Sequence, residues 1–123
     1  MKNTIIWFEI NVVDLDRAKK FYDHVLQTNI RKEEMEGSPP MGIIPDEGVN
    51  GALVEDEEYE APEHSGVMLY FDGSSGINPY LERVEEAGGE VVVPRSFVNE
   101  SVGHWAAFSD LDGNMFAFYE PPK

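Results

Sequence analysis

The order of helical and strand patterns constrains this chain most, because the same order occurs twice. The first helix is predicted to begin after Asp14, a good N-cap, and to stop at Asn29 in a left-handed conformation. The second is predicted to have Asn78 as its N-cap and Pro79 at its first helical position, and to end at the glycine pair 88–89. Apolar residues recur at helical spacing in both segments, so each helix has one face to bury.

Short β-rich stretches surround both helices, and the turn signal 112–114 separates the last two. The predicted strands are 5–13, 30–35, 41–44, 52–54, 67–71, 90–93, 104–109 and 115–119. Each half is therefore predicted to run strand, helix, strand, strand, strand. We expect an α+β fold in a single domain, 1–123, made of two modules of approximately 1–60 and 61–123.

Composition excludes several classes of function. The chain has 123 residues, no cysteine and a formal net charge of −15. Disulfides and thiolate chemistry are thus excluded, and such an acidic surface disfavours nucleic acid and anionic membranes. No apolar run approaches the roughly 18 residues that span a bilayer, and the start lacks a signal peptide. These features predict a cytoplasmic protein.

Three motifs carry a resemblance to a known family. The stretch 7–22 joins a strand to Asp-Leu-x-Arg-Ala and Phe-Tyr, 88–94 follows the second helix, and 108–114 ends in Asp-Leu-Asp-Gly-Asn. In this order and spacing they resemble the vicinal oxygen chelate superfamily of glyoxalases, bleomycin resistance proteins and dioxygenases. The resemblance implies paired βαβββ modules that form a curved mixed sheet around a cleft, commonly completed by a second subunit, and we expect a homodimer.

In metal-dependent members of that family the cleft holds a divalent ion, bound by His, Gln or Glu from the strands. The matching positions in this sequence are Trp7, Gly66 and Ala117, and none of these can ligate through its side chain. The chain resembles a branch of predicted lactoylglutathione-lyase-related proteins that lack the usual ligands. We therefore expect no metal and no cofactor.

Candidate site residues follow from the resemblance and from the period-two alternation of strands. Alternation places Glu9 and Asn11 on the same face as Trp7, where Glu9 is a candidate catalytic base, a substrate acceptor, or a carboxylate satisfied by the sheet. With Glu9, His64 and His104 form the one assortment that resembles a substitute metal or acid/base site. The residues predicted to bind a ligand are Trp7, Glu9, Asn11, His64, Met68, Tyr70, His104 and Tyr119.

Aromatic and methionine side chains suggest that the cleft is an aromatic pocket, although such residues in sheets more often pack a core. The set also includes Trp105 and Met115, and Arg95 is either a partner of an anionic ligand or of a surface acid. The leading interpretation is a small-molecule-binding protein or metal-independent enzyme. A metal-dependent lyase or dioxygenase with relocated ligands, and a protein-interaction module, remain the alternatives.

Overall fold

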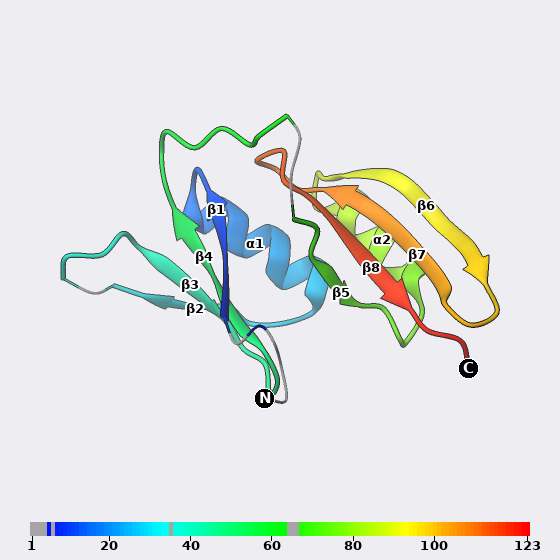
Figure 1. The fold of residues 1–123 in the computed structure, drawn as a ribbon. Helices are drawn as coiled ribbons and strands as arrows, with labels where there is room; N and C mark the ends of the chain where they lie inside the picture. Colours follow the sequence, from blue (N-terminus) through cyan, green and yellow to red (C-terminus); the bar gives the residue numbers. More distant parts are fainter. Residues whose placement is uncertain (1–4, 6, 35, 64–66) are drawn as a thin grey trace. The chain divides into compact units, whose positions relative to one another are not determined.

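The structure is a computed structural model and describes residues 5, 7–34, 36–63 and 67–123. Within these residues the chain forms two helices and eight strands, in two compact units, Met1–Tyr59 and Glu60–Lys123. Each unit runs strand, helix, strand, strand, strand and has one mixed four-stranded sheet (Figure 1). The α+β fold and the twofold order of elements predicted from the sequence are confirmed. Neither helix in the described part of the chain has the length and apolar character that crossing a bilayer requires.

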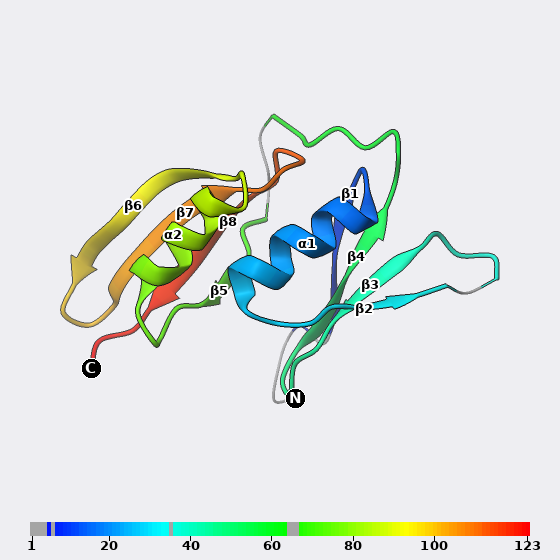
Figure 2. The ribbon, with the colours of Figure 1, turned by 180° about the vertical axis from the view of Figure 1, so that it is seen from behind.

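Unit 1 places its helix α1 along one face of its sheet (Figure 2). Its elements are β1 (Trp7–Val12), α1 (Leu15–Leu26), β2 (Arg31–Glu33), β3 (Met41–Ile44) and β4 (Asn50–Glu55). The sheet order is β1-β4-β3-β2, with β1 parallel to β4 and the other pairs antiparallel. The α1 side chains at helical spacing, among them Ala18, Phe21 and Val25, are buried, as their pattern predicts.

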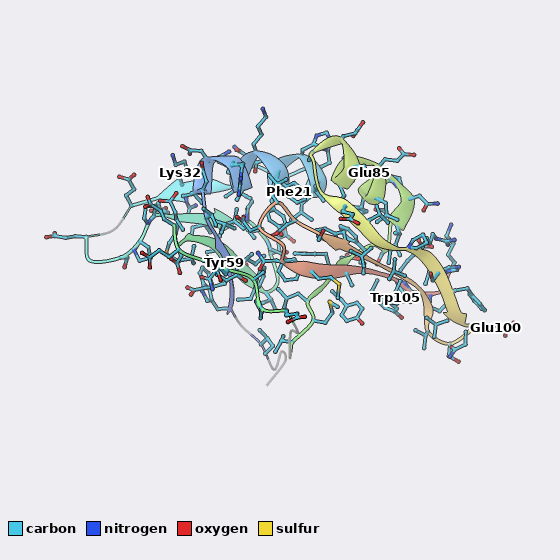
Figure 3. All side chains as sticks on the ribbon, turned by 90° about the horizontal axis from the view of Figure 1, so that it is seen from above. Phe21, Lys32, Tyr59, Glu85, Glu100 and Trp105 are labelled. Carbon is cyan, nitrogen blue, oxygen red and sulfur yellow. The ribbon has the colours of Figure 1, made fainter. Side chains whose placement is uncertain are left out.

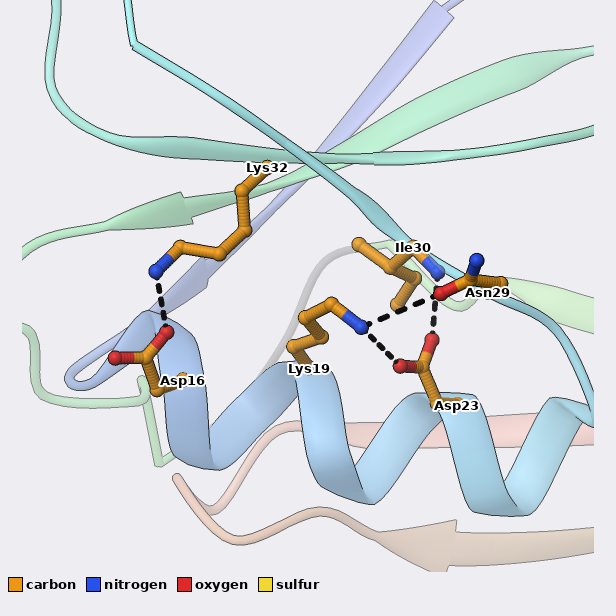
Figure 4. Close-up of polar contacts among 6 residues, drawn as sticks. All are labelled: Asp16, Lys19, Asp23, Asn29, Ile30 and Lys32. Carbon is orange, nitrogen blue, oxygen red and sulfur yellow. Dashed lines mark hydrogen bonds and ion pairs between the residues drawn. The ribbon is translucent and has the colours of Figure 1, made fainter.

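The start of α1 matches the prediction and its end does not. Asp14 is the N-cap and accepts a hydrogen bond from the Arg17 backbone N–H at 3.1 Å. The left-handed residue that ends the helix is Gln27, at φ 53°, and not Asn29. Asp23 explains the earlier stop, because its carboxylate accepts the Ile30 backbone N–H at 2.6 Å and so holds the chain just after the helix (Figure 4).

Two ion pairs involve α1, and one of them joins the helix to the strand that follows it (Figure 4). Lys19 donates to Asp23 one turn further along the helix, at 2.5 Å. Lys32 of β2 donates to Asp16 in the first turn of α1, at 2.6 Å, where a negative charge also suits the helix dipole. The second of these contacts joins α1 to β2 at the protein surface, and the buried apolar face of α1 packs the helix on its sheet.

Unit 2 repeats this arrangement. Its elements are β5 (Tyr70–Asp72), α2 (Ile77–Glu86), β6 (Glu90–Asn99), β7 (Gly103–Ser109) and β8 (Met115–Glu120). The sheet order is β5-β8-β7-β6, with β5 parallel to β8. The helix packs on one face, where Phe118 stacks on Tyr80 at 4.7 Å between ring centroids. The other face of this sheet, which carries Met115, Ala117 and Tyr119 of β8, is called here the α2-distal face.

The predicted start of α2 is wrong. The helix begins at Ile77, with Gly76 as an N-cap that offers no side chain, so Asn78 and Pro79 are its second and third residues. Proline is tolerated there because the first four N–H groups of a helix have no partner inside the helix. The cap comes instead from β8, where the Glu120 carboxylate accepts the Ile77 backbone N–H at 2.9 Å.

The same capping device occurs in unit 1. The Glu55 carboxylate, at the end of β4, accepts the backbone N–H of Leu15, the first residue of α1, at 2.9 Å. In both units the last strand runs parallel to the first strand. This last strand ends in a glutamate that caps the helix of its unit. The two modules are therefore related at the level of single residues, a repeat that the sequence does not display openly.

Candidate functional site

A hollow of about 430 Å³ opens on the α2-distal face of unit 2. It is lined by Tyr70, Val98, Val102, Trp105 and Tyr119. These residues come from β5, the end of β6, the turn that follows it, β7 and β8. Trp105 lies on the side of the sheet away from α2 (Figure 3). Three of the aromatic residues predicted to line a pocket are thereby brought together.

The register of the sheet explains why these side chains meet. Tyr119 is paired with Trp105 on one side and with Asp72 on the other, and directly paired residues share a face. Tyr70 is paired with Ala117, which is itself fully buried. On its other side Ala117 is paired with Ala107 of β7, so the two rows of paired residues next to one another on this face are Tyr70, Ala117 and Ala107, and Asp72, Tyr119 and Trp105.

A hydrogen bond and a glycine hold the wall formed by the β6–β7 hairpin. The Tyr119 hydroxyl donates to the Val102 carbonyl oxygen, which ties the hairpin turn to β8. Gly103 has φ +97°, and a Cβ atom there would lie 2.4 Å from the Glu120 carbonyl oxygen. Only glycine allows the chain to pass so close to β8 in that conformation. The wall is thus fixed by backbone geometry as well as by packing.

The other face of β8 carries an ion pair that the sequence did not predict as such. Arg95 donates to Glu120 through both Nε, at 3.0 Å, and one terminal nitrogen, at 2.7 Å. Arg95 and the Ile77 backbone N–H together lower the pKa of the Glu120 carboxyl to about 2. Of the two partners predicted for Arg95, the structure therefore shows an acid of the protein itself. Glu120 lies on the face opposite Tyr119 and caps a helix.

His104 lies on the same side of β7 as this ion pair. It is paired with Glu120 across the ladder, and its ring is 5.2 Å from that of Phe97 between centroids. Since side chains alternate along a strand, His104 faces away from Trp105 and does not line the hollow. Its predicted role in ligand binding gains no geometric support from the hollow.

In unit 1, the predicted face of β1 is open to solvent. The exposed positions of β1 are Trp7, Glu9 and Asn11, and they alternate with less exposed residues. The Trp7 indole Nε1 donates to the Glu9 carboxylate at 3.2 Å. These two side chains therefore act as a pair, in which the carboxylate orients the ring.

The remaining predicted residues divide into two groups. His64 and Gly66 lie outside the described residues. Met68 is half-buried and Met115 is 41% exposed, on the face that holds the hollow, but neither lines it. Val98 and Val102 line the hollow and were missed by the sequence analysis, which ended the strand at Val93.

The described residues at the family's metal-ligand positions are Trp7 and Ala117. Trp7 offers only an N–H donor and Ala117 a methyl group, so neither supplies a lone pair for a metal ion. Within the described ranges, no three His, Asp or Glu side chains gather in a way that could hold an ion, and no buried side-chain nitrogen or oxygen lacks a hydrogen-bond partner. These residues do not fit a metal at the family position.

The sequence and the fold of the chain are similar to those of known proteins. The family model described as the Glyoxalase/Bleomycin resistance protein/Dioxygenase superfamily matches residues 4–118. No curated protein sequence matches the chain. A solved structure of a hypothetical protein from S. aureus is 28% identical, has a TM-score of 0.71, and each chain covers 98% of the other.

Two further structures share the fold at lower identity. One is FosX, a genomically encoded fosfomycin resistance protein from Listeria monocytogenes, in a mutant form complexed with Mn(II) and 1S,2S-dihydroxypropylphosphonic acid. It is 19% identical, with a TM-score of 0.74 and coverage of 98% of this chain and 92% of FosX. The other is TnmS3, an antibiotic binding protein from Streptomyces sp. CB03234, at 21% identity, a TM-score of 0.66 and coverage of 97% and 96%.

Proposed function

This chain belongs to the Glyoxalase/Bleomycin resistance protein/Dioxygenase superfamily, and we propose that within it the chain is a small-molecule-binding protein whose ligand occupies the hollow of unit 2. The observation that carries the proposal is the hollow itself, of about 430 Å³ and lined by three aromatic and two valine side chains. Its volume falls within the range of ordinary ligand pockets. A protein with the same fold, TnmS3, is described as an antibiotic binding protein.

The lining favours recognition by apolar contact and ring stacking. Tyrosine and tryptophan give large contact areas at little cost in conformational entropy, and each has a single polar group at its edge. The Tyr119 hydroxyl already donates to Val102, which leaves the Tyr70 hydroxyl and the Trp105 indole N–H as the nearest polar groups of the wall. The ligand is therefore expected to be largely apolar, with few hydrogen-bonding groups.

The exposed face of β1, in unit 1, is a second surface that offers apolar contact and ring stacking. Trp7 is 42% exposed, and its bond to Glu9 holds the ring in place. In the proposal, Trp7, Glu9 and Asn11 bind a ligand at this surface of unit 1, and Glu9 is the candidate general base if a molecule bound there is also transformed. No metal takes part in either role.

Binding in the hollow is tested with a neutral apolar fluorophore, N-phenyl-1-naphthylamine, titrated into the full chain. Tyr70 is 56% exposed and lines the hollow, whereas Phe97 is 62% exposed and does not. Tyr70→Ala and Phe97→Ala are thus matched substitutions of exposed aromatic residues in one unit. We expect the first to weaken probe binding about tenfold and the second to leave it within twofold.

Two outcomes would contradict the proposal. One is the absence of saturable binding of the probe to the unsubstituted protein. The other is an equal loss of binding in Tyr70→Ala and Phe97→Ala, which would place the probe on the general apolar surface of unit 2. Circular dichroism of both variants serves as the control for folding.

A further inference from the structure

Two acidic residues of unit 2 lie near the hollow. Asp72 is paired with Tyr119 in the register of β5 and β8, two residues along β5 from Tyr70. Asp72 is therefore on the face that carries the hollow, at its β5 side. Glu100 lies in the turn between Val98 and Val102, at the tip of the β6–β7 hairpin (Figure 3). Carboxylates thus lie on two sides of an aromatic lining.

The cations of unit 2 are engaged elsewhere or lie at the chain end. Arg95 is bound to Glu120 on the α2 side of the sheet. The Arg83 guanidinium lies 4.7 Å above the ring of Tyr80, on α2. Lys123 is the last residue of the chain and is exposed. The two arginines of unit 2 therefore do not offset the negative charge near the hollow.

Asp72 carries its charge throughout the neutral range. The Ser74 hydroxyl and backbone N–H both donate to Oδ1 of Asp72. These bonds stabilise the ionised form and lower the pKa of the Asp72 carboxyl from its ordinary value. The bonds also fix the side chain at the end of β5, so the negative charge is held in position.

We propose that the ligand of the hollow is a cation with an apolar or aromatic body, such as a quaternary or protonated amine. This inference rests on the proposed function and names its ligand class. The geometry supplies the two components that bind such a molecule, aromatic rings in Tyr70, Trp105 and Tyr119 and an ionised carboxylate in Asp72. The negative π faces of aromatic rings attract a cation within about 6 Å, and a carboxylate on the same face adds to the attraction.

The experiment uses three probes of one shape. They are the cation 3-hydroxyphenyltrimethylammonium, its neutral isostere 3-tert-butylphenol, and the anion 3-hydroxybenzenesulfonate. Each is titrated into the full chain, and the Trp105 indole N–H peak is followed in proton–nitrogen correlation spectra. The chain contains two tryptophans, so a Trp7→Phe variant assigns the peak.

We expect the cation to bind at least about tenfold more tightly than the neutral isostere, and the anion not to bind. Asp72→Asn keeps the acceptor for Ser74 but removes the charge, and should weaken the cation about fivefold without changing the neutral isostere. Glu85→Gln is the matched control, because Glu85 is exposed on α2, on the other side of the sheet (Figure 3). It removes one charge from the same unit and should change neither affinity.

Each other outcome has a distinct meaning. If the neutral isostere binds as tightly as the cation, the hollow binds small molecules but the ligand class proposed here is wrong. If Glu85→Gln weakens the cation as much as Asp72→Asn does, the preference reflects net charge and the assignment to Asp72 is overturned. If no probe moves the Trp105 peak at millimolar concentration, both this inference and the proposed function fail.

Discussion

Replacement of Glu120 by glutamine perturbs a contact that joins α2, β6 and β8. The Glu120 side chain is nearly buried, caps the start of α2 through the Ile77 N–H, and accepts two bonds from Arg95. Glutamine has almost the same shape, and its amide oxygen can still accept from Ile77. Glu120→Gln therefore removes the charge and leaves Arg95 opposite an amide, while the packing changes little.

The magnitude follows from the pKa. The carboxyl of Glu120 has a pKa of about 2 in the folded protein, against an ordinary value of 4.5. At about 1.4 kcal/mol for each tenfold change in proton affinity, this difference corresponds to about 3 kcal/mol of folding free energy at neutral pH. Arg95 is 34% exposed, and solvent screening reduces the expected loss to about 2 kcal/mol.

The sign of the pH dependence is fixed by the same numbers. Because the folded pKa lies below the unfolded one, the contribution is fully present above about pH 4.5 and is lost as the pH falls towards about 2. The unsubstituted protein and Glu120→Gln should thus differ at pH 7 and approach each other near pH 2 to 3. The difference comes from the unsubstituted protein, which loses stability as Glu120 takes up a proton.

Urea denaturation followed by Trp105 fluorescence in a Trp7→Phe background reports on unit 2. A loss of about 2 kcal/mol at pH 7 corresponds to a shift in the midpoint of about 1 to 2 M urea. Glu85→Gln, an exposed acid on the same helix, is the control and should change the midpoint little. Equal midpoints for Glu120→Gln and the unsubstituted protein at pH 7, or a difference that persists unchanged at pH 2, would refute the reasoning.

Three further predictions follow from the sequence and the site. Trp7→Ala should cost less than the roughly 3–5 kcal/mol of a deleted core aromatic, because Trp7 is 42% exposed; Phe118→Ala, at a fully buried ring, should cost that much in the same urea assay. Protein purified without a histidine tag should hold no stoichiometric metal after incubation with zinc, nickel or manganese and desalting; near-equimolar metal that is lost in Glu9→Ala would contradict this. The chain should form a homodimer, and a monomer in sedimentation equilibrium at tens of micromolar would count against it.

Local signals predicted much of the fold because they act within a few residues. Asp14 caps α1, and the helix 77–86 is followed by Gly88 at φ +94°, as its glycine pair predicts. The start of α2 was misplaced for a different reason. Its cap is Glu120, which lies 43 residues away in sequence, so the Asn-Pro pair near the helix start was the strongest signal that a local pattern could offer.

The sequence pattern predicted some of the residues that line the hollow and missed others. The reason that it missed them is again physical. The aromatic and methionine residues predicted as pocket candidates include Tyr70, Trp105 and Tyr119, which line the hollow. The period-two alternation did not reach Val98, because β6 continues to Asn99 with irregularities in its pairing to β7. Each irregularity shifts the alternation of side chains, so a strict period cannot be followed through it.

The face of β8 that carries Ala117 and Tyr119 can be compared with what a metal site and an aromatic ligand site require. A catalytic metal needs about three converging side chains with lone pairs and a position left open for the substrate. Here the position of one expected ligand is a buried methyl group, and the next residue on that face is an aromatic ring within the hollow. Ala117 offers no donor to a metal ion, whereas Tyr119 offers a ring to an apolar ligand, so the side chains on this face match the proposed ligand site and not the family's metal position.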